Sequence, residues 1–395
     1  MATANEDRIG YFNVNVMSKR IVYIVGDLSY PNGMSRVLSQ KVNYLAEHTD
    51  YELYVVLTEQ ADKPWYYQLS PKIQYVNFGL DFDSIYQMPF LKRLLAYSRK
   101  QKQYRKLLTD YLMQVRPDIT VSVLRREINF INDIPDGSKK VGEIHFNKLT
   151  YRVFEKHWLP GWVNRFITHR WQKSLEKEVR RLDKFVVLTR QDASNWVGFD
   201  NVVVIPNPIS FFPKTVSDGQ AKKVIAVGRY TRQKGFDLLI KAWQMVNARH
   251  TDWVLNIYGP GNREEYQQMV DALQLLDVIH CNEASPDIYA RYAEHSIFVL
   301  SSRYEGFGLV IAEAMATGLP AVSFRCPCGP EDIITDYEDG LLVENGNIEA
   351  LAEAICYMIE HPEERHLMAE KALLSARRYH EDAIMQKWIQ LFDCL

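Results

Sequence analysis

The sequence predicts an α/β protein with two Rossmann-like lobes, each built on a parallel sheet. Short apolar runs alternate with longer helical patterns along the chain, which is typical of helices packed on a parallel sheet. This alternation occurs twice, on either side of a proline-containing seam. The chain also has 395 residues, more than one ordinary core contains.

The first lobe is predicted over residues 1–204. Its strands are expected in β-branched apolar runs without alternation, a pattern typical of strands covered on both faces. These runs span 21–26, 53–58, 73–78, 119–124, 184–189 and 202–205, with helices expected over 34–47, 91–108 and 170–182. Residues 1–16 lack the basic start and apolar core of a secretory signal. We expect them to be disordered or to precede a native start at Met17.

The seam between the lobes is predicted at residues 205–209, where Pro206 and Pro208 prevent a helix or a ladder from continuing. The polar stretch 214–223 that follows has the composition of a linker. The second lobe is predicted over 205–375, with strands over 224–228, 254–258 and 297–301 and helices over 236–247, 263–275, 308–317 and 348–360. Residues 376–395 are predicted to form a C-terminal helix that returns to the first lobe.

Composition argues against several classes of function. The formal net charge is −2, so no global field attracts nucleic acid, and no nucleic-acid partner is expected. No run of 18 or more apolar residues is present, which excludes an ordinary spanning helix and favours a cytoplasmic location. The five cysteines include Cys326-Pro327-Cys328, which we interpret as a loop of reduced thiols and not as a metal site.

The first candidate ligand-binding motif spans residues 228–235, Gly-Arg-Tyr-Thr-Arg-Gln-Lys-Gly, between a predicted strand and a predicted helix. Arg229 and Lys234 place two cations near a helix N-terminus, where a phosphate or diphosphate binds well. A solvated basic loop is the alternative. The motif is not a Walker loop, because the spacing and the Ser or Thr after the Lys are absent.

The second motif spans residues 301–313, where a strand is predicted to end and a helix to begin near Gly308. Glu305 is expected outside the carboxyl end of the strand, where ligands bind in open α/β sheets. Glu313 is expected more than one turn into the helix. Carboxylates accept hydrogen bonds from sugar hydroxyls, whereas an exposed carboxylate pair is the alternative.

Together the motifs resemble those of the family 4 retaining glycosyltransferases, which build bacterial polysaccharides and glycolipids. The resemblance implies the GT-B fold, in which the parallel sheets of two Rossmann-like lobes face each other across a cleft. The family's two glutamates, separated by seven residues, match Glu305 and Glu313. Its Gly-Arg…Lys-Gly phosphate motif matches residues 228, 229, 234 and 235. The resemblance runs from about residue 20 to the C-terminus and is strongest over 202–345.

The resemblance implies a role for each matching residue of the second lobe. Arg229 and Lys234 would hold the donor diphosphate and neutralise the leaving nucleotide. Glu313 would bind the ribose hydroxyls and Glu305 the donor hexose. Two loops, 259–261 and 282–284, would flank the base. The amides that would point at the phosphate or sugar are those of Phe307, Gly308 and Leu309.

The first lobe would contribute the acceptor side and two donor contacts. Family members usually have two glycines after the first strand, where this chain has Asn32 and Gly33. Asn tolerates left-handed backbone, so we expect the turn to survive with Gly33 over the diphosphate; a turn without a ligand is the alternative. By position, His145 would contact the donor sugar, against the alternative of a structural histidine.

Two further patterns have competing interpretations. Asp81-Phe82-Asp83 resembles a metal-binding DxD motif but lies far in sequence from the phosphate motif, so no metal is assigned to it. The basic residues between 92 and 106 alternate with Leu and Tyr, which fits either an amphipathic helix on an anionic membrane or a solvated helix. Another aromatic-rich segment, which favours the membrane, contains Trp158, Trp162, Phe166 and Trp171.

The resemblance implies transfer of a hexose from a nucleoside diphosphate sugar, most simply a UDP-sugar, to a hydroxyl of a saccharide or lipid-linked saccharide with retained configuration. The predicted catalytic residues are Glu305, His145, Arg229 and Lys234. No metal or cofactor is expected, because fixed cations stabilise the departing diphosphate. The alternatives are a UDP-sugar epimerase or phosphorylase of the same fold, and a non-catalytic sugar-nucleotide-binding protein.

Overall fold

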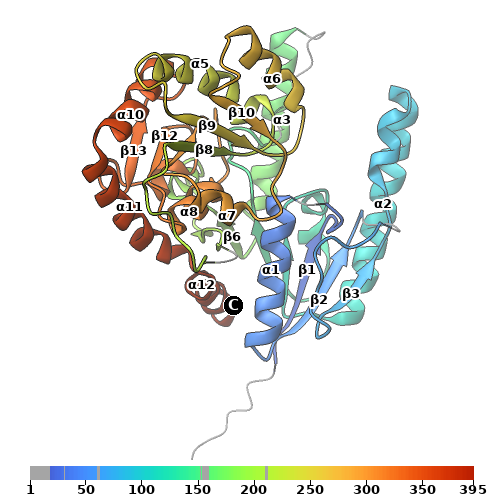
Figure 1. The fold of residues 1–395 in the computed structure, drawn as a ribbon. Coiled ribbons are helices and arrows are strands. Elements are labelled where there is room, and N and C mark those ends of the chain that lie inside the picture. Colours follow the sequence, from blue (N-terminus) through green and yellow to red (C-terminus); the bar gives the residue numbers. More distant parts are fainter. Residues whose placement is uncertain (1–17, 31, 60–62, 152, 154–159, 210–211) are drawn as a thin grey trace, which may run out of the picture.

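The chain folds into two lobes, each organised around one parallel sheet (Figure 1). The computed structural model describes residues 18–30, 32–59, 63–151, 153, 160–209 and 212–395, so the expectations for residues 1–16, Met17 and Trp158 lie outside the described residues. The N-terminal sheet has the order β3-β2-β1-β4-β5-β6-β7 and the C-terminal sheet the order β10-β9-β8-β11-β12-β13. The predicted α/β fold with two Rossmann-like lobes is confirmed.

The N-terminal strands are mostly buried and apolar, except the edge strand β3, in which Gln74, Tyr75 and Asn77 are exposed. They are β1 (Arg20–Val25), β2 (Glu52–Leu57), β3 (Gln74–Asn77), β4 (Ile119–Ser122), β5 (Lys139–Glu143), β6 (Lys184–Val187) and β7 (Val202–Val204). β5 differs because two of its buried residues, Lys140 and Glu143, are charged. Each has an ion-pair partner, so an apolar pattern alone does not delimit this strand.

The C-terminal strands are β8 (Lys223–Val227), β9 (Val254–Tyr258), β10 (Ile279–Asn282), β11 (Ile297–Leu300), β12 (Ala321–Phe324) and β13 (Gly340–Val343). The sequence does not predict β10, β12 or β13. Each of these strands includes or adjoins residues that interrupt an apolar run: His280 and Asn282 lie in β10, Pro320 precedes β12, and Gly340 begins β13.

The helices cover both faces of the sheets. Around the N-terminal sheet lie α1 (Gly33–His48), α2 (Phe90–Val115), α3 (Gly161–Val179) and α4 (Arg190–Ser194). The other lobe contains α5 (Phe236–Asn247), α6 (Arg263–Ala272), α7 (Ile288–Ala293), α8 (Leu309–Ala316), α9 (Pro330–Ile333), α10 (Ile348–Glu360) and α11 (Pro362–Ala376). α2 extends seven residues beyond its predicted end, and α3 begins nine residues before its predicted start. In the part of the chain that the structure describes, no helix is long and apolar enough to cross a membrane.

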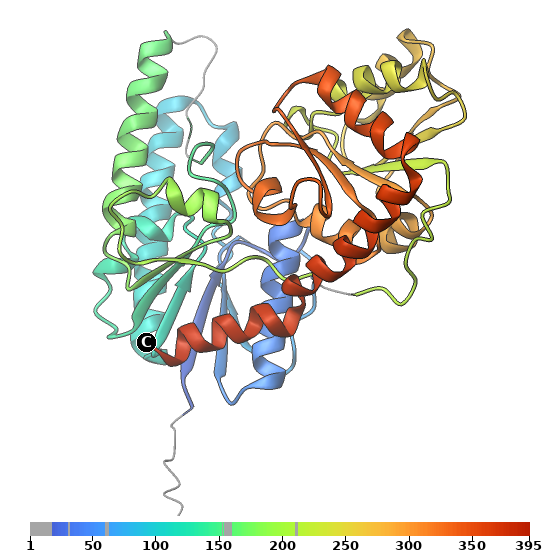
Figure 2. The same cartoon turned by 90° about the vertical axis from the view of Figure 1, so that its left-hand side faces the viewer.

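The last helix, α12 (Glu381–Asp393), leaves the C-terminal lobe and packs beneath the N-terminal sheet (Figure 2). Its Phe392 ring meets the ring of Tyr23 in β1 edge-on, with centroids 6.4 Å apart. The Tyr44 hydroxyl of α1 donates to Asp382 at 2.8 Å. Where the chain crosses back, the amide of Ile209 donates to the carbonyl of Tyr379 at 2.8 Å, so the two crossings between the lobes pair with each other.

Candidate active site

The carboxyl ends of the two sheets meet at one place. In the C-terminal sheet, β8 lies between β9 and β11, so the chain order switches between β8 and β11. Ligands bind at such switch points in open α/β sheets. The loop after β8 carries the basic motif and the loop after β11 carries Glu305. Both predicted motifs therefore lie side by side at the switch point.

Lys234 and Glu305 form the centre of this site. The ammonium of Lys234 donates to Glu305 Oε1 at 2.6 Å, and the hydroxyl of Ser302 donates to the same oxygen at 2.6 Å. The side chains of Lys234 and Glu305 are 13% and 8% exposed. An ammonium has three donors, so Lys234 keeps hydrogen-bonding capacity for a second anion. The structure thus brings together two of the four predicted catalytic residues.

Glycines allow the basic loop to approach its neighbours. A Cβ on Gly228 would lie 3.0 Å from Cδ of Lys234, so the lysine stem needs a glycine beneath it. Gly235 has φ of 65° and precedes α5, and a Cβ there would collide with the carbonyl of Ser301. The hydroxyl of Ser301 donates to the carbonyl of Lys234 at 2.9 Å. These contacts fix Lys234 against the loop that carries Glu305.

A salt bridge joins the same two loops from the outside. The guanidinium of Arg303 donates to both carboxylate oxygens of Asp237, at 2.8 and 2.7 Å, which is the strong bidentate geometry. The amide of Arg303 also donates to the carbonyl of Gln233 at 2.8 Å. The site is therefore prearranged by a rigid junction between the β8 and β11 loops.

The start of α8 offers backbone donors beside Glu305. Gly308 has φ of 88° and directly precedes the helix. Within the described chain, the amides of Phe307, Gly308 and Leu309 donate no hydrogen bond to another residue. Free amides and the positive end of the helix dipole favour an anion at this point. The geometry suits the phosphate-facing or sugar-facing role predicted for them.

Glu313 lies one turn deeper in α8 and forms an ion pair with Arg36 of α1, across the cleft. Burial raises the pKa of the Glu313 carboxyl, while Arg36 opposes that rise. Arg36 is a site residue that the sequence analysis did not assign. The sequence feature that could have identified Arg36 is its position: it is a cation in the first turn of the helix after the first strand, where anionic ligands bind.

The turn before α1 differs from its predicted geometry. Asn32 has φ of −136° and ψ of 157°, so it is extended and not left-handed. Its side chain instead accepts a hydrogen bond from the amide of Ser35 at 2.9 Å, which caps α1. Gly33 begins the helix, and a Cβ there would meet nothing within 4 Å. The prediction that Asn32 adopts a left-handed backbone was therefore wrong. Asn32 instead caps the N-terminus of α1.

His145 follows β5 and faces the β11 loop of the other lobe. Its side chain is 4% exposed, and Nε2 lies 3.2 Å from Glu143 Oε1. Its carbonyl is so close to Gly306 that a Cβ on that glycine would collide with it. The buried amide of Asn147 donates to the carbonyl of Glu305 at 2.6 Å. The structure thus packs the backbone of His145 against the loop that carries Glu305, although the two residues come from different lobes.

Arg229 is exposed beside this centre. Among the described residues, no carboxylate pairs with its guanidinium. The loop that carries it is held by the neighbouring strand, because the amide of Gly228 donates to the carbonyl of Tyr258 at 2.9 Å and the amide of Tyr230 to that of Pro260 at 2.8 Å. The guanidinium is therefore accessible to an anion that enters next to Lys234.

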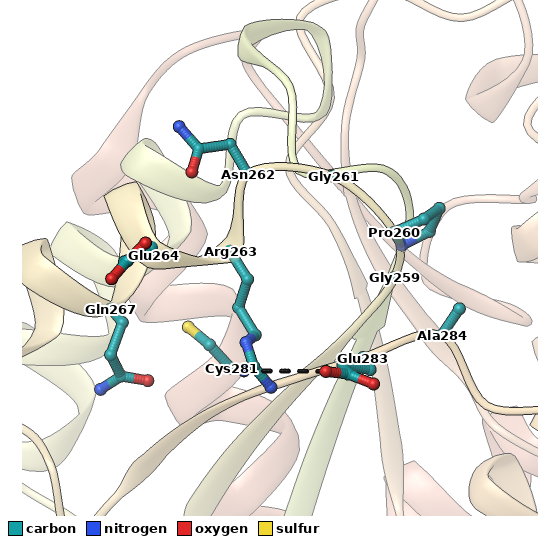
Figure 3. Close-up of a pocket in the computed structure, with 10 residues that line it drawn as sticks. All are labelled: Gly259, Pro260, Gly261, Asn262, Arg263, Glu264, Gln267, Cys281, Glu283 and Ala284. Atoms are coloured by element: carbon teal, nitrogen blue, oxygen red, sulfur yellow. Dashed lines mark ion pairs between the residues drawn. The ribbon is translucent and has the colours of Figure 1, made fainter.

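A pocket of about 910 Å³ adjoins the Arg229 loop, at the carboxyl ends of β9 and β10 (Figure 3). The backbone of residues 259–261 forms one side, and Glu283 with Ala284 forms the other. The side chains of Arg263, Gln267 and Cys281 point into the space between them. Arg263 and Glu283 form a loose ion pair at 3.8 Å. These are the two loops that the sequence analysis assigned to the base.

The Asp-Phe-Asp and Cys-Pro-Cys sequences each contain side chains that are buried in the protein. Phe82 of the Asp-Phe-Asp sequence is buried beneath the guanidinium of Arg126, with 4.2 Å to the ring centroid. Cys326 and Cys328 are buried free thiols, and burial raises the pKa of Cys328 to about 12. Over the described ranges, no three His, Cys, Asp or Glu side chains are arranged to hold a metal ion.

Comparison with known proteins finds a family match in the second lobe. Residues 209–374 match the family described as Glycosyl transferases group 1. The site elements of this lobe, from the Arg229 loop to α8, lie within the matched residues. Among the relatives are named bacterial glycosyltransferases, which agrees with the predicted resemblance.

The chain is 34% identical over 215 residues to an uncharacterized glycosyltransferase of Haemophilus influenzae, a match that covers 53% of this chain and 61% of the relative. It is 30% identical over 222 residues to the amylovoran biosynthesis glycosyltransferase AmsD of Erwinia amylovora, covering 53% and 62%. The chain therefore spans less than two thirds of the length of these relatives.

The whole fold has solved counterparts. A point mutant of S. aureus TarM, in complex with fondaparinux, alpha-GlcNAc-glycerol and UDP, superimposes with a TM-score of 0.73. The match covers 95% of this chain and 99% of TarM at 17% identity, a level at which it shows the fold alone. The two lobes together form the GT-B fold, and this prediction is confirmed.

Proposed function

We propose that the chain is a retaining glycosyltransferase. It moves a hexose from a UDP-sugar to a hydroxyl of a saccharide or lipid-linked saccharide in bacterial surface polysaccharide biosynthesis. The observation that carries this proposal is the buried Lys234–Glu305 pair at the switch point, beside three unused amides at the start of α8. The polysaccharide-building relative and the UDP bound by TarM support the substrate classes.

The donor would lie along one continuous path in this proposal. The base enters the pocket of residues 259–261 and 282–284, and the ribose hydroxyls displace Arg36 from Glu313. The diphosphate lies between Lys234, Arg229 and the amides of α8. The hexose then reaches Glu305 and His145, and Gly33 covers the diphosphate from the other lobe.

Charge stabilisation would supply most of the catalysis. As the bond from the sugar to the diphosphate breaks, negative charge grows on the leaving phosphate. Lys234, Arg229 and the α8 amides are already in place, so they stabilise that charge with little reorganisation. We propose that the leaving phosphate takes the acceptor proton on the same face of the sugar, and that the reaction needs neither a metal nor a cofactor.

Two other functions use the same fold and remain as outcomes of the test. A UDP-sugar epimerase would convert the donor without an acceptor. A non-catalytic protein would bind the nucleotide sugar without turnover. The group 1 family match and the complete set of Arg229, Lys234, Glu305 and Glu313 favour transfer over both.

A donor screen followed by a transfer assay tests the proposal. Nucleotide sugars are screened for thermal stabilisation of the protein, because a ligand that binds only the native state raises its stability. The stabilising UDP-sugar should then give a glycosylated acceptor, with the anomeric configuration of the donor visible by NMR, in buffer containing EDTA. Transfer that stops in EDTA and returns with a divalent ion would refute the metal-free mechanism. Isomerised UDP-sugar without an acceptor product would establish the epimerase.

We also propose peripheral contact with an anionic membrane at the cytoplasmic face, through the first turns of α2 and α3. These helices have 26 and 19 residues, so they are about 39 and 28 Å long. The strands beside them have four to six residues, so the helices extend past the sheet in both views (Figures 1 and 2). Their exposed apolar side chains include Leu94, Leu95, Trp162 and Phe166.

Replacing Lys92, Arg99 and Lys102 together by Gln should reduce flotation of the protein with anionic vesicles. Each basic residue near an anionic surface contributes about 1 kcal/mol, so the triple variant should bind at least about tenfold more weakly at low salt. Lys100 is left in place because its ammonium donates to the carbonyl of Asp81 at 2.8 Å. A charge-matched control replaces Lys214, Lys241 and Lys371 of the C-terminal lobe. Equal flotation of both variants would contradict membrane contact through α2.

A further inference from the structure

A buried row of charged side chains lies behind His145. The ammonium of Lys41 in α1 and the carboxylate of Glu143 in β5 form an ion pair in which each side chain is 1% exposed. The same oxygen, Glu143 Oε1, lies 3.2 Å from Nε2 of His145. On the other side, the Trp388 ring of α12 lies beneath the ammonium, with 3.8 Å from Nζ to the ring centroid.

Burying this row of charges costs free energy, and the row has no part in the charge stabilisation proposed above. Two buried charges lose their hydration, and well-packed apolar residues in their place often give equal or greater stability. Stability alone therefore gives no reason to keep Lys41 and Glu143. What distinguishes the pair is the contact of Glu143 with His145, which links it to the proposed donor site.

The Glu143 carboxylate lies on the Nε2 side of the His145 ring, 3.2 Å from that nitrogen. Burial opposes ionisation, but the Lys41 ammonium holds the pKa of the Glu143 carboxyl well below its usual range. An ionised carboxylate only accepts hydrogen bonds, so it favours a proton on the ring nitrogen that faces it. A neutral ring with its proton on Nε2 has a lone pair on Nδ1.

Nδ1 is then the atom left for a ligand. Within the described part of the chain, it is buried and has no hydrogen-bond partner. The Nε2 contact has the distance of an ion pair but not the angle of a hydrogen bond. A buried acceptor without a donor is unfavourable, and a sugar hydroxyl beside Glu305 would supply that donor.

We propose that Glu143, held in place by Lys41, is a positioning residue for His145. It keeps the ring in the tautomer with the proton on Nε2, and Nδ1 accepts a hydrogen bond from a hydroxyl of the donor hexose. The role at the sugar rests on the proposed function, whereas the tautomer is a property of the free protein. α12 takes part because its Trp388 ring holds the Lys41 ammonium in place.

The tautomer is measured on the full chain without substrate, by ¹⁵N NMR of labelled histidine, with His145→Gln to identify the signal of His145. The native protein should show His145 protonated on Nε2. In the double variant Lys41→Met/Glu143→Gln both charges are removed together, so no unpaired charge remains to unfold the protein. This variant should show a mixed or reversed tautomer. A native ring protonated on Nδ1 would overturn the proposal.

Kinetics with the UDP-sugar and acceptor provide the second measurement. The double variant should lower kcat for transfer about tenfold, the effect of one hydrogen bond, and change KM for the donor less than about threefold. The matched control Lys140→Met/Asp136→Asn removes another ion pair of β5 that does not touch His145. It should keep both the tautomer and kcat. A double variant with native tautomer and native kcat would also overturn the proposal.

The two proposals fail in different ways. If no nucleotide sugar gives transfer but the tautomer depends on Glu143 as expected, the proposed function is wrong and the positioning of His145 stands. If transfer occurs but the tautomer is unchanged in the double variant, the proposed function stands and the role of Glu143 is wrong.

Discussion

Replacing Lys234 by Met should lower kcat/KM for sugar transfer by about 100- to 1,000-fold, the usual effect of removing one fixed donor for a developing anion. Met keeps most of the apolar stem that packs on Gly228 but removes the ammonium that contacts Glu305. Affinity for UDP should fall as well, because the same ammonium faces the diphosphate in the ground state. Steady-state kinetics and calorimetric titration with UDP measure the two effects.

The control for this variant is Lys222→Met, which removes an exposed lysine at the start of the same lobe. Its ammonium pairs with Asp252, far from the cleft, and exposed pairs contribute about 1 kcal/mol or less to stability. Activity of this control should be native. If Lys234→Met binds UDP as tightly as the native protein, the placement of the diphosphate at Lys234 is wrong.

Replacing Trp388 by Ala should destabilise the protein by about 3–5 kcal/mol, the range for truncating a large aromatic side chain in a core. Trp388 is 1% exposed and packs against Phe392, with ring centroids 5.5 Å apart. The same substitution removes the ring beneath Lys41 and so weakens the attachment of α12 to the N-terminal lobe. Urea unfolding followed by circular dichroism measures the loss.

Trp162→Ala serves as the matched control, since this tryptophan is 67% exposed. Surface substitutions usually change stability by about 0.5 kcal/mol or less. The unfolding midpoint of the control should therefore stay close to that of the native chain. Equal midpoints for the two variants would show that α12 does not contribute to the core of the N-terminal lobe.

Much of the site could be predicted because its residues lie in loops that directly follow strands. In a parallel sheet such loops share one edge, so the basic motif and Glu305 had to lie on the same side of the C-terminal lobe. Their actual contact, Lys234 to Glu305, depends on β8 and β11 being neighbours. Strand order is a tertiary property that no local pattern records.

The missed residues have the same explanation. Arg36 meets Glu313 from the other lobe, 277 positions away in sequence. Lys41 and Glu143 are charged residues at buried positions, where a hydropathy pattern predicts apolar ones. The strands β12 and β13 are short, and Pro320 before β12 and Gly340 at the start of β13 interrupt their apolar runs. All of these depend on partners that only the folded chain brings close.

The paired crossings between the lobes determine how the cleft can open. One crossing near Ile209 and a second near Tyr379 are joined by a backbone hydrogen bond, so they act as one pivot. A single tether would let the lobes twist and slide freely, whereas a double one resists both and leaves mainly a swing about its own axis. Donor entry and product release would then follow the same arc, and each closure would return Arg36 and His145 to the same register against α8.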